Sequence, residues 1–191
     1  MNAWQPGTRR AVGAIAPFVI YTVVYLGFVV VGCRVSGDVA FLVGPWFFVV
    51  GLPLLILAYA FAARAVGFDV PLALVSVLCA AAGVGRFFTW VVVFEWGRSG
   101  GDPFLWGGLW VLVEVGLISV LLGPTLRARA VVLALLAAPA LAVEFGRFHH
   151  AGDLGLEPVT TFVILMPFDL ARNLGQFWLA CWLRKAGRAS A

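Results

Sequence analysis

Four polar residues recur at helical spacing near the C-terminal end of an otherwise apolar sequence. Asp169, Arg172, Asn173 and Gln176 stand at positions i, i+3, i+4 and i+7, which places them on one face of an α-helix. A carboxyl, a guanidinium and two amides on one face can hold a polar group, transfer a proton or pair with charges on a neighbouring helix. Because the surrounding residues are apolar, we expect this face to border a cavity or a polar interface and to avoid lipid.

Ionisable residues also interrupt other long apolar stretches, and three acidic ones match three basic ones. Each costs about 2.5–3.5 kcal/mol to insert at the centre of a membrane helix, so such residues are expected to face inward and to pair. We expect Arg86 to pair with Glu144, and Glu114 to pair with the Asp169–Arg172 pair. The acids are Glu114, Glu144 and Asp169, and the bases are Arg86, Arg147 and Arg172.

The composition indicates the environment in which these charges must be accommodated. The chain has 191 residues, of which 63% are hydrophobic and 12% charged, and its mean hydropathy is +1.04. A soluble domain of this size cannot bury so much apolar surface, so a soluble enzyme, a disordered tail and a disulfide-rich secreted domain are excluded. The sequence predicts an all-α polytopic membrane protein.

The long apolar intervals predict a single transmembrane domain over residues 1–191, built as a bundle of six helices. All spans are expected to be helical, because an open sheet would leave backbone groups unpaired in lipid. Repeated Gly-Asp turns at Gly37-Asp38, Gly101-Asp102 and Gly152-Asp153 raise the alternative of three tandem helical hairpins, although glycine and aspartate are also common turn formers. The expected spans are 11–33, 39–63, 70–94, 103–123, 130–148 and 158–183.

The distribution of basic residues predicts the orientation of this bundle in the cell membrane. Lysine and arginine are enriched on the cytoplasmic side of membrane proteins. The chain ends and the even-numbered connections carry most of them, whereas the other side holds Arg34 and Arg98, with Arg147 near the border. Both termini are therefore expected to be cytoplasmic. The basic residues on that side are Arg9, Arg10, Arg64, Arg127, Arg129, Arg184, Lys185 and Arg188.

The sequence shows no pattern typical of a metal site or a nucleic-acid-binding surface. The adjacent His149 and His150 point about 100° apart on a helix and are poorly spaced for one metal ion. We therefore expect no metal and no cofactor, and the scattered arginines do not form a nucleic-acid-binding surface. Cys33 follows an apolar run that resembles a lipoprotein processing site, but the run is long for a signal peptide, so an uncleaved anchor helix is the preferred interpretation.

The preferred functional interpretation is an integral membrane enzyme that acts by acid/base chemistry on a hydrophobic substrate, such as an isoprenoid or another lipid-like molecule. A buried carboxyl group kept protonated by its surroundings would donate a proton, and aromatic faces could stabilise a developing carbocation. We expect Glu114, Asp169 and Glu144 to be the catalytic groups. The expected substrate-binding residues are Arg86, Arg172, Asn173, Gln176, Trp90 and Trp110.

Two other classes of function remain compatible with the same residues. A small transporter or channel would use the polar face of the sixth span as its path. A non-catalytic subunit or assembly factor of a membrane complex would use that face as a helix interface. The expected partners are membrane lipids, a small hydrophobic ligand, and either further copies of this chain or a larger membrane complex, with no nucleic acid.

Overall fold

The computed structural model describes residues 6–34, 38–98, 103–123, 129 and 158–189. In this part of the chain all regular secondary structure is helical, and it contains no strand, which confirms the predicted α-helical class. The helices are α1 (Pro6–Arg34), α2 (Asp38–Ala65), α3 (Leu72–Arg98), α4 (Pro103–Leu122) and α6 (Pro158–Ala189). The expected ranges 11–33, 39–63 and 158–183 fall within α1, α2 and α6. The range 103–123 runs one residue past the end of α4, and 70–94 begins two residues before α3. The range 130–148, with Glu144, lies outside the described residues.

The residues at the helix starts explain where the chain becomes helical. Pro6, Pro103 and Pro158 each open a helix, and proline is favoured at the first helical position because its fixed φ suits the helix and its missing N–H costs nothing there. Asp38 opens α2, and aspartate is a preferred residue at a helix start because its side chain can accept hydrogen bonds from the first backbone N–H groups.

The connection from α2 to α3 is a tight turn that begins at a left-handed glycine. Gly67 has a φ of +86°, a conformation that residues with a Cβ atom adopt rarely. Its N–H donates to the Arg64 carbonyl at 2.9 Å, and the Phe68 N–H donates to the Ala63 carbonyl at 2.9 Å. These two bonds form a Schellman cap. The Arg64 guanidinium then donates to the Val70 carbonyl, at 2.6 Å from Nη2, which fixes the start of α3.

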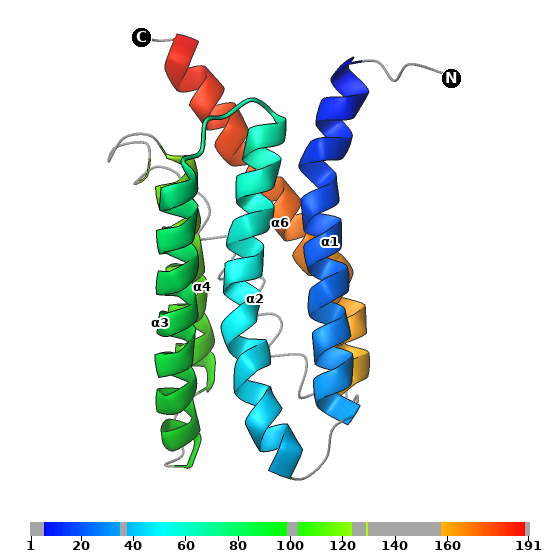
Figure 1. The fold of residues 1–191 in the computed structure, drawn as a ribbon, viewed down its shortest axis with the longest axis vertical. Helices are drawn as coiled ribbons and strands as arrows, with labels where there is room; N and C mark the ends of the chain where they lie inside the picture. Colours follow the sequence, from blue (N-terminus) through cyan, green and yellow to red (C-terminus); the bar gives the residue numbers. More distant parts are fainter. Residues whose placement is uncertain (1–5, 35–37, 99–102, 124–128, 130–157, 190–191) are drawn as a thin grey trace.

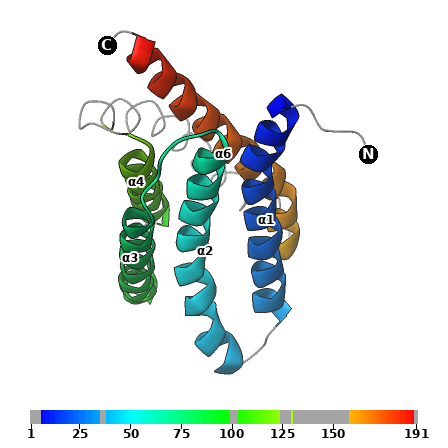
Figure 2. The same cartoon turned by 45° about the horizontal axis from the view of Figure 1, so that its top comes forward.

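The helices form a bundle in which α2 occupies the centre (Figure 1). It packs against α1, α3 and α4, while α1 also packs against α6 and α3 against α4. Glycines bring α1 and α2 close together, because a Cβ atom on Gly13 would stand 3.0 Å from the Ala65 Cβ and one on Gly51 would stand 2.8 Å from the Tyr25 ring. Such small residues allow helix backbones to approach each other. α6 crosses the bundle obliquely behind α1 and α2 (Figure 1 and Figure 2).

One helical segment within the described residues is both long and apolar enough to cross a membrane. It is Thr8–Gly27 in α1, near the N-terminus. Three further apolar helical segments are shorter: Val49–Ala65, Leu72–Phe88 and Leu112–Leu122.

Candidate functional site

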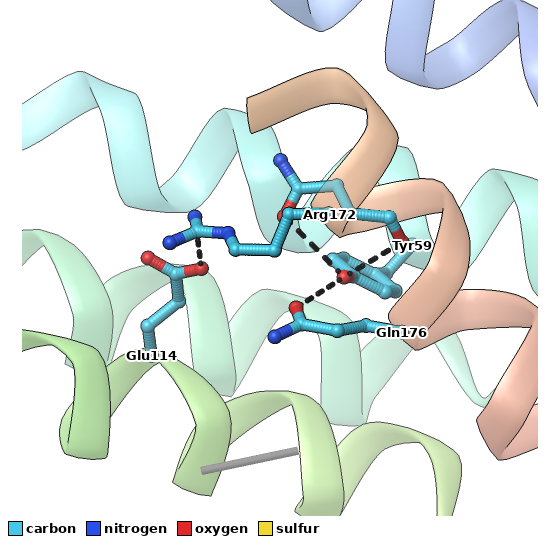
Figure 3. A network of polar contacts seen from close by, with 5 residues as sticks. Tyr59, Glu114, Arg172 and Gln176 are labelled. Atoms are coloured by element: carbon cyan, nitrogen blue, oxygen red, sulfur yellow. Dashed lines mark hydrogen bonds and ion pairs between the residues drawn. The ribbon is translucent and has the colours of Figure 1, made fainter. Parts of the chain in front are cut away.

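The described polar side chains of the expected site converge between α2, α4 and α6. Arg172 on α6 donates from Nη2 to Oε1 of Glu114 on α4 at 3.2 Å, as Figure 3 shows. The Arg172 and Glu114 side chains are only 9% and 11% exposed. The contact between Glu114 and Arg172 that the sequence led us to expect is therefore present, as a buried ion pair.

A tyrosine hydroxyl lies beside this ion pair and connects α2 with α6. The Tyr59 hydroxyl is 3.1 Å from the Asn173 carbonyl and 3.2 Å from Oε1 of Gln176, and its longer contact with Oδ1 of Asn173 is 3.5 Å. Asn173 and Gln176 are 1% and 4% exposed. We call the five residues that make these contacts the polar cluster: Tyr59, Glu114, Arg172, Asn173 and Gln176.

Aromatic packing fixes the position of the Tyr59 hydroxyl. The Tyr59 ring meets Phe18 of α1 edge to face, with ring centroids 4.8 Å apart and planes at 88°. Phe177 of α6 packs against both rings, at 5.6 Å from Phe18 and 6.3 Å from Tyr59. All three side chains are fully buried. The edge-to-face geometry of the Phe18–Tyr59 pair is a favourable one, and the packing holds the Tyr59 ring while its hydroxyl contacts α6.

The Tyr59 hydroxyl lies near more hydrogen-bond acceptors than it can donate to. A tyrosine hydroxyl has one proton to donate, and the closest acceptor is the Asn173 carbonyl. Meanwhile Nε2 of Gln176 is buried and has no hydrogen-bond partner among the residues that the structure describes. If the amide were reversed, its nitrogen would donate to Tyr59 and its oxygen would take the open position. In either orientation one buried polar atom of Gln176 has no hydrogen-bond partner among the described residues.

Two more residues lie within electrostatic range of the ion pair. Tyr21 on α1 interacts electrostatically with Glu114, Asp169 and Arg172, so α1 also borders the polar cluster. Asp169 is half-buried on α6, one helical turn before Arg172. The two carboxyl groups expected to act in catalysis, Glu114 and Asp169, are thus brought into the same region of the bundle.

Long side chains, and not close backbone packing, join α6 to α2 and α4. Among the described helices α6 packs closely against α1. The contacts that join it to α2 and α4 include the polar contacts of Tyr59 and Glu114 with the polar face of α6, and the ring contact of Tyr59 with Phe177. In Figure 3 the side-chain amide nitrogen of Gln176 points away from Tyr59, toward the side on which α4 carries Glu114.

Other residues of the expected site are placed less completely. Arg86 is half-buried on α3 with its Nε atom inside the bundle, but its expected partner Glu144 lies outside the described residues. Trp90 and Trp110 belong to α3 and α4, and their side chains lie outside what the structure describes. No group of three or more potential metal ligands occurs within the described residues, and His149 and His150 are not among these.

Sequence reasoning missed Tyr59, although this residue connects the two helices. Charges and amides indicated the other site residues, whereas Tyr59 lies in the uncharged interval 39–63. A hydroxyl inside a long apolar helix is a usable signal, because a buried tyrosine usually finds a hydrogen-bond partner.

Comparisons with known proteins yield no relative for this site. No protein-family model matches the chain, and neither the curated proteins nor the solved structures contain a significant match.

Proposed function

We propose that this chain is a multi-pass protein of the cell membrane, a bundle of six spans with both termini cytoplasmic. The described helices contain 29, 28, 27, 20 and 32 residues, and about 20 residues suffice to cross the hydrocarbon core. Large apolar side chains are exposed on the outside of the bundle, among them Ile20, Val23, Val77, Phe88 and Trp182. Apolar groups outside with polar groups buried inside suit a protein surrounded by lipid.

The course of the chain supports an even number of spans. α1 begins and α6 ends at the same end of the bundle (Figure 1 and Figure 2). α4 and α6 also run in the same direction, so the chain between Leu122 and Pro158 has to return to the opposite end before α6 begins. A fifth span over 130–148 would provide this return.

Reporter fusions test this topology directly. A fluorescent protein that folds only in the cytoplasm is expected to fluoresce when fused after Ala191, and alkaline phosphatase at the same place is expected to be inactive. Reporters inserted between Gly100 and Gly101 should behave in the opposite way, because this loop is assigned to the outer side. Active phosphatase at Ala191 would contradict the proposed orientation.

We propose further that the polar cluster is the active site of an integral membrane enzyme that transfers protons to or from a hydrophobic, isoprenoid or lipid-like substrate. The observation that carries this proposal is the buried amide nitrogen of Gln176, which has no hydrogen-bond partner among the described residues and points toward the side on which α4 carries Glu114 (Figure 3). An unsatisfied buried polar group costs about 1–3 kcal/mol, and a ligand that satisfies it recovers this cost when it binds.

The ion pair suggests how Glu114 could act on such a substrate. Arg172 contacts Oε1 and fixes the orientation of the carboxylate. The second oxygen, Oε2, has no hydrogen-bond donor among the described residues, so it is available to exchange a proton with the substrate. A positioned acid or base of this kind contributes typically 10²–10⁴-fold to a rate. Asp169, in the same region, is the expected second proton-transfer group.

Deuterium incorporation tests the reaction even while the substrate is unidentified. The purified protein would be incubated in D₂O with lipids extracted from its own membranes, and the lipids would be examined by mass spectrometry. A proton removed from carbon and returned from solvent-exchanged Glu114 adds one mass unit. We expect one lipid species to gain deuterium with the active protein. No incorporation into any species would contradict a proton-transfer enzyme.

A non-catalytic subunit is the second candidate, and the linkage of α2, α4 and α6 by the polar cluster favours it. Buried ion pairs and amides can fix the register of membrane helices without any turnover. In that case the cluster residues would affect stability alone, and the protein would be isolated with stoichiometric partner chains.

A further inference from the structure

The open position in the polar cluster restricts the chemistry of the group that can occupy it. Gln176 offers an N–H group that is buried and has no partner among the described residues, so the group must accept a hydrogen bond. Glu114 offers the oxygen that Arg172 does not contact, so a group that also donates a hydrogen bond gains a second contact. A hydroxyl group does both. It also suits the reversed orientation of the Gln176 amide, to which it would donate.

The charges around this position disfavour an anionic group. Arg172 is the cation of the polar cluster, and it already contacts the Glu114 carboxylate. Asp169 adds a second carboxyl group in the same region, within range of Tyr21 together with Glu114 and Arg172. A phosphate or carboxylate headgroup would therefore face two acids and compete with Glu114 for the guanidinium. A neutral group meets neither obstacle.

We propose that the polar cluster binds the hydroxyl group of a neutral long-chain alcohol. The hydroxyl oxygen accepts a hydrogen bond from the Gln176 amide, and the hydroxyl group donates a hydrogen bond to the Glu114 carboxylate. This inference rests on the proposed function, and it names the substrate class: an unphosphorylated alcohol whose apolar chain lies among the helices. The Phe18, Tyr59 and Phe177 rings supply an apolar wall next to the cluster.

Binding of three matched compounds tests the proposal on the full chain in detergent. The compounds are a tritium-labelled prenyl alcohol, its monophosphate and the hydrocarbon of the same chain length. Two hydrogen bonds to the hydroxyl predict that the alcohol binds about tenfold more tightly than the hydrocarbon. The phosphate is expected to bind no better than the hydrocarbon.

Replacement of Gln176 by methionine supplies the decisive variant. Methionine has a similar length and no amide, and Tyr59 keeps the Asn173 carbonyl as its acceptor, so Gln176→Met should fold and melt no lower than the parent without ligand. One of the two hydrogen bonds to the hydroxyl is then lost, so the affinity for the alcohol should fall about threefold, toward that for the hydrocarbon. Ser119→Ala is the control, because the Ser119 hydroxyl donates within α4, to the Gly116 carbonyl at 2.7 Å, and its removal should leave all three affinities unchanged.

The outcomes separate this inference from the proposed function. Tighter binding of the phosphate, equal binding of alcohol and hydrocarbon, or full alcohol affinity in Gln176→Met would each overturn the alcohol assignment while a hydrophobic ligand site remains. Failure of all three compounds to bind the folded protein would overturn the alcohol assignment and the hydrophobic ligand site together.

Discussion

Replacement of Arg172 by methionine is expected to lower the free energy of unfolding by about 3–5 kcal/mol. The Glu114 side chain is 11% exposed and contacts the Arg172 guanidinium at 3.2 Å. Removal of the guanidinium leaves a carboxylate in the interior of the bundle without its counter-charge, and a buried charge without a partner is strongly destabilising. The loss is measurable as a lower unfolding midpoint in a detergent titration followed by tryptophan fluorescence.

A double variant distinguishes the cost of an unpaired charge from the loss of arginine packing. Glu114→Leu combined with Arg172→Met places apolar groups at both positions, which is often neutral or stabilising for a buried pair. We therefore expect the double variant to recover most of the stability lost in Arg172→Met. If the two substitutions instead destabilise additively, the ion pair makes no net contribution and the geometry between α4 and α6 has another origin.

The second large effect is expected on the rate of proton transfer. Glu114→Gln should lower deuterium incorporation into the substrate lipid by about 10²–10⁴-fold, because an amide cannot exchange a proton as a carboxyl group does. Glutamine keeps the size of the side chain and an oxygen that Arg172 can contact. The rate is measured by mass spectrometry of lipids in D₂O and is expressed per folded protein.

Two comparisons make the rate experiment specific. Ser119→Ala, on the same helix as Glu114, should keep the parent rate, because the Ser119 hydroxyl bonds within α4. A rate in Glu114→Gln that falls only in proportion to the folded fraction would remove Glu114 from the chemistry. The polar cluster would then serve as an attachment between helices, as the accessory-subunit interpretation holds.

The helices could be predicted because the apolar composition of the chain leaves few alternative types of secondary structure. Uncharged intervals of spanning length can satisfy their backbone groups only as helices or closed barrels, and the alternation of a barrel strand is absent. The Glu114–Arg172 contact could also be predicted, because an acidic residue inside a long apolar interval is expected to pair with a basic one.

The contribution of Tyr59 could not be predicted in the same way. α2 is apolar on all sides over 39–63, so its sequence carries no periodic polar face that would fix its rotation about its own axis. The packing of Phe18 and Phe177 determines that rotation, and these residues come from α1 and α6. The sequence also does not determine which aromatic residues near the charges face the cluster. Phe177 is buried beside the cluster, whereas Phe87, Phe88 and Phe168 lie on the outside of the bundle.

Native mass spectrometry of the gently purified protein, with extraction of its bound lipids, tests most directly whether the polar cluster is a ligand site. We predict one neutral, hydroxyl-bearing lipid per chain of the parent protein, and a lower occupancy by this lipid in Gln176→Met at unchanged stability. A parent protein that carries no lipid and arrives instead with stoichiometric partner chains would contradict the account.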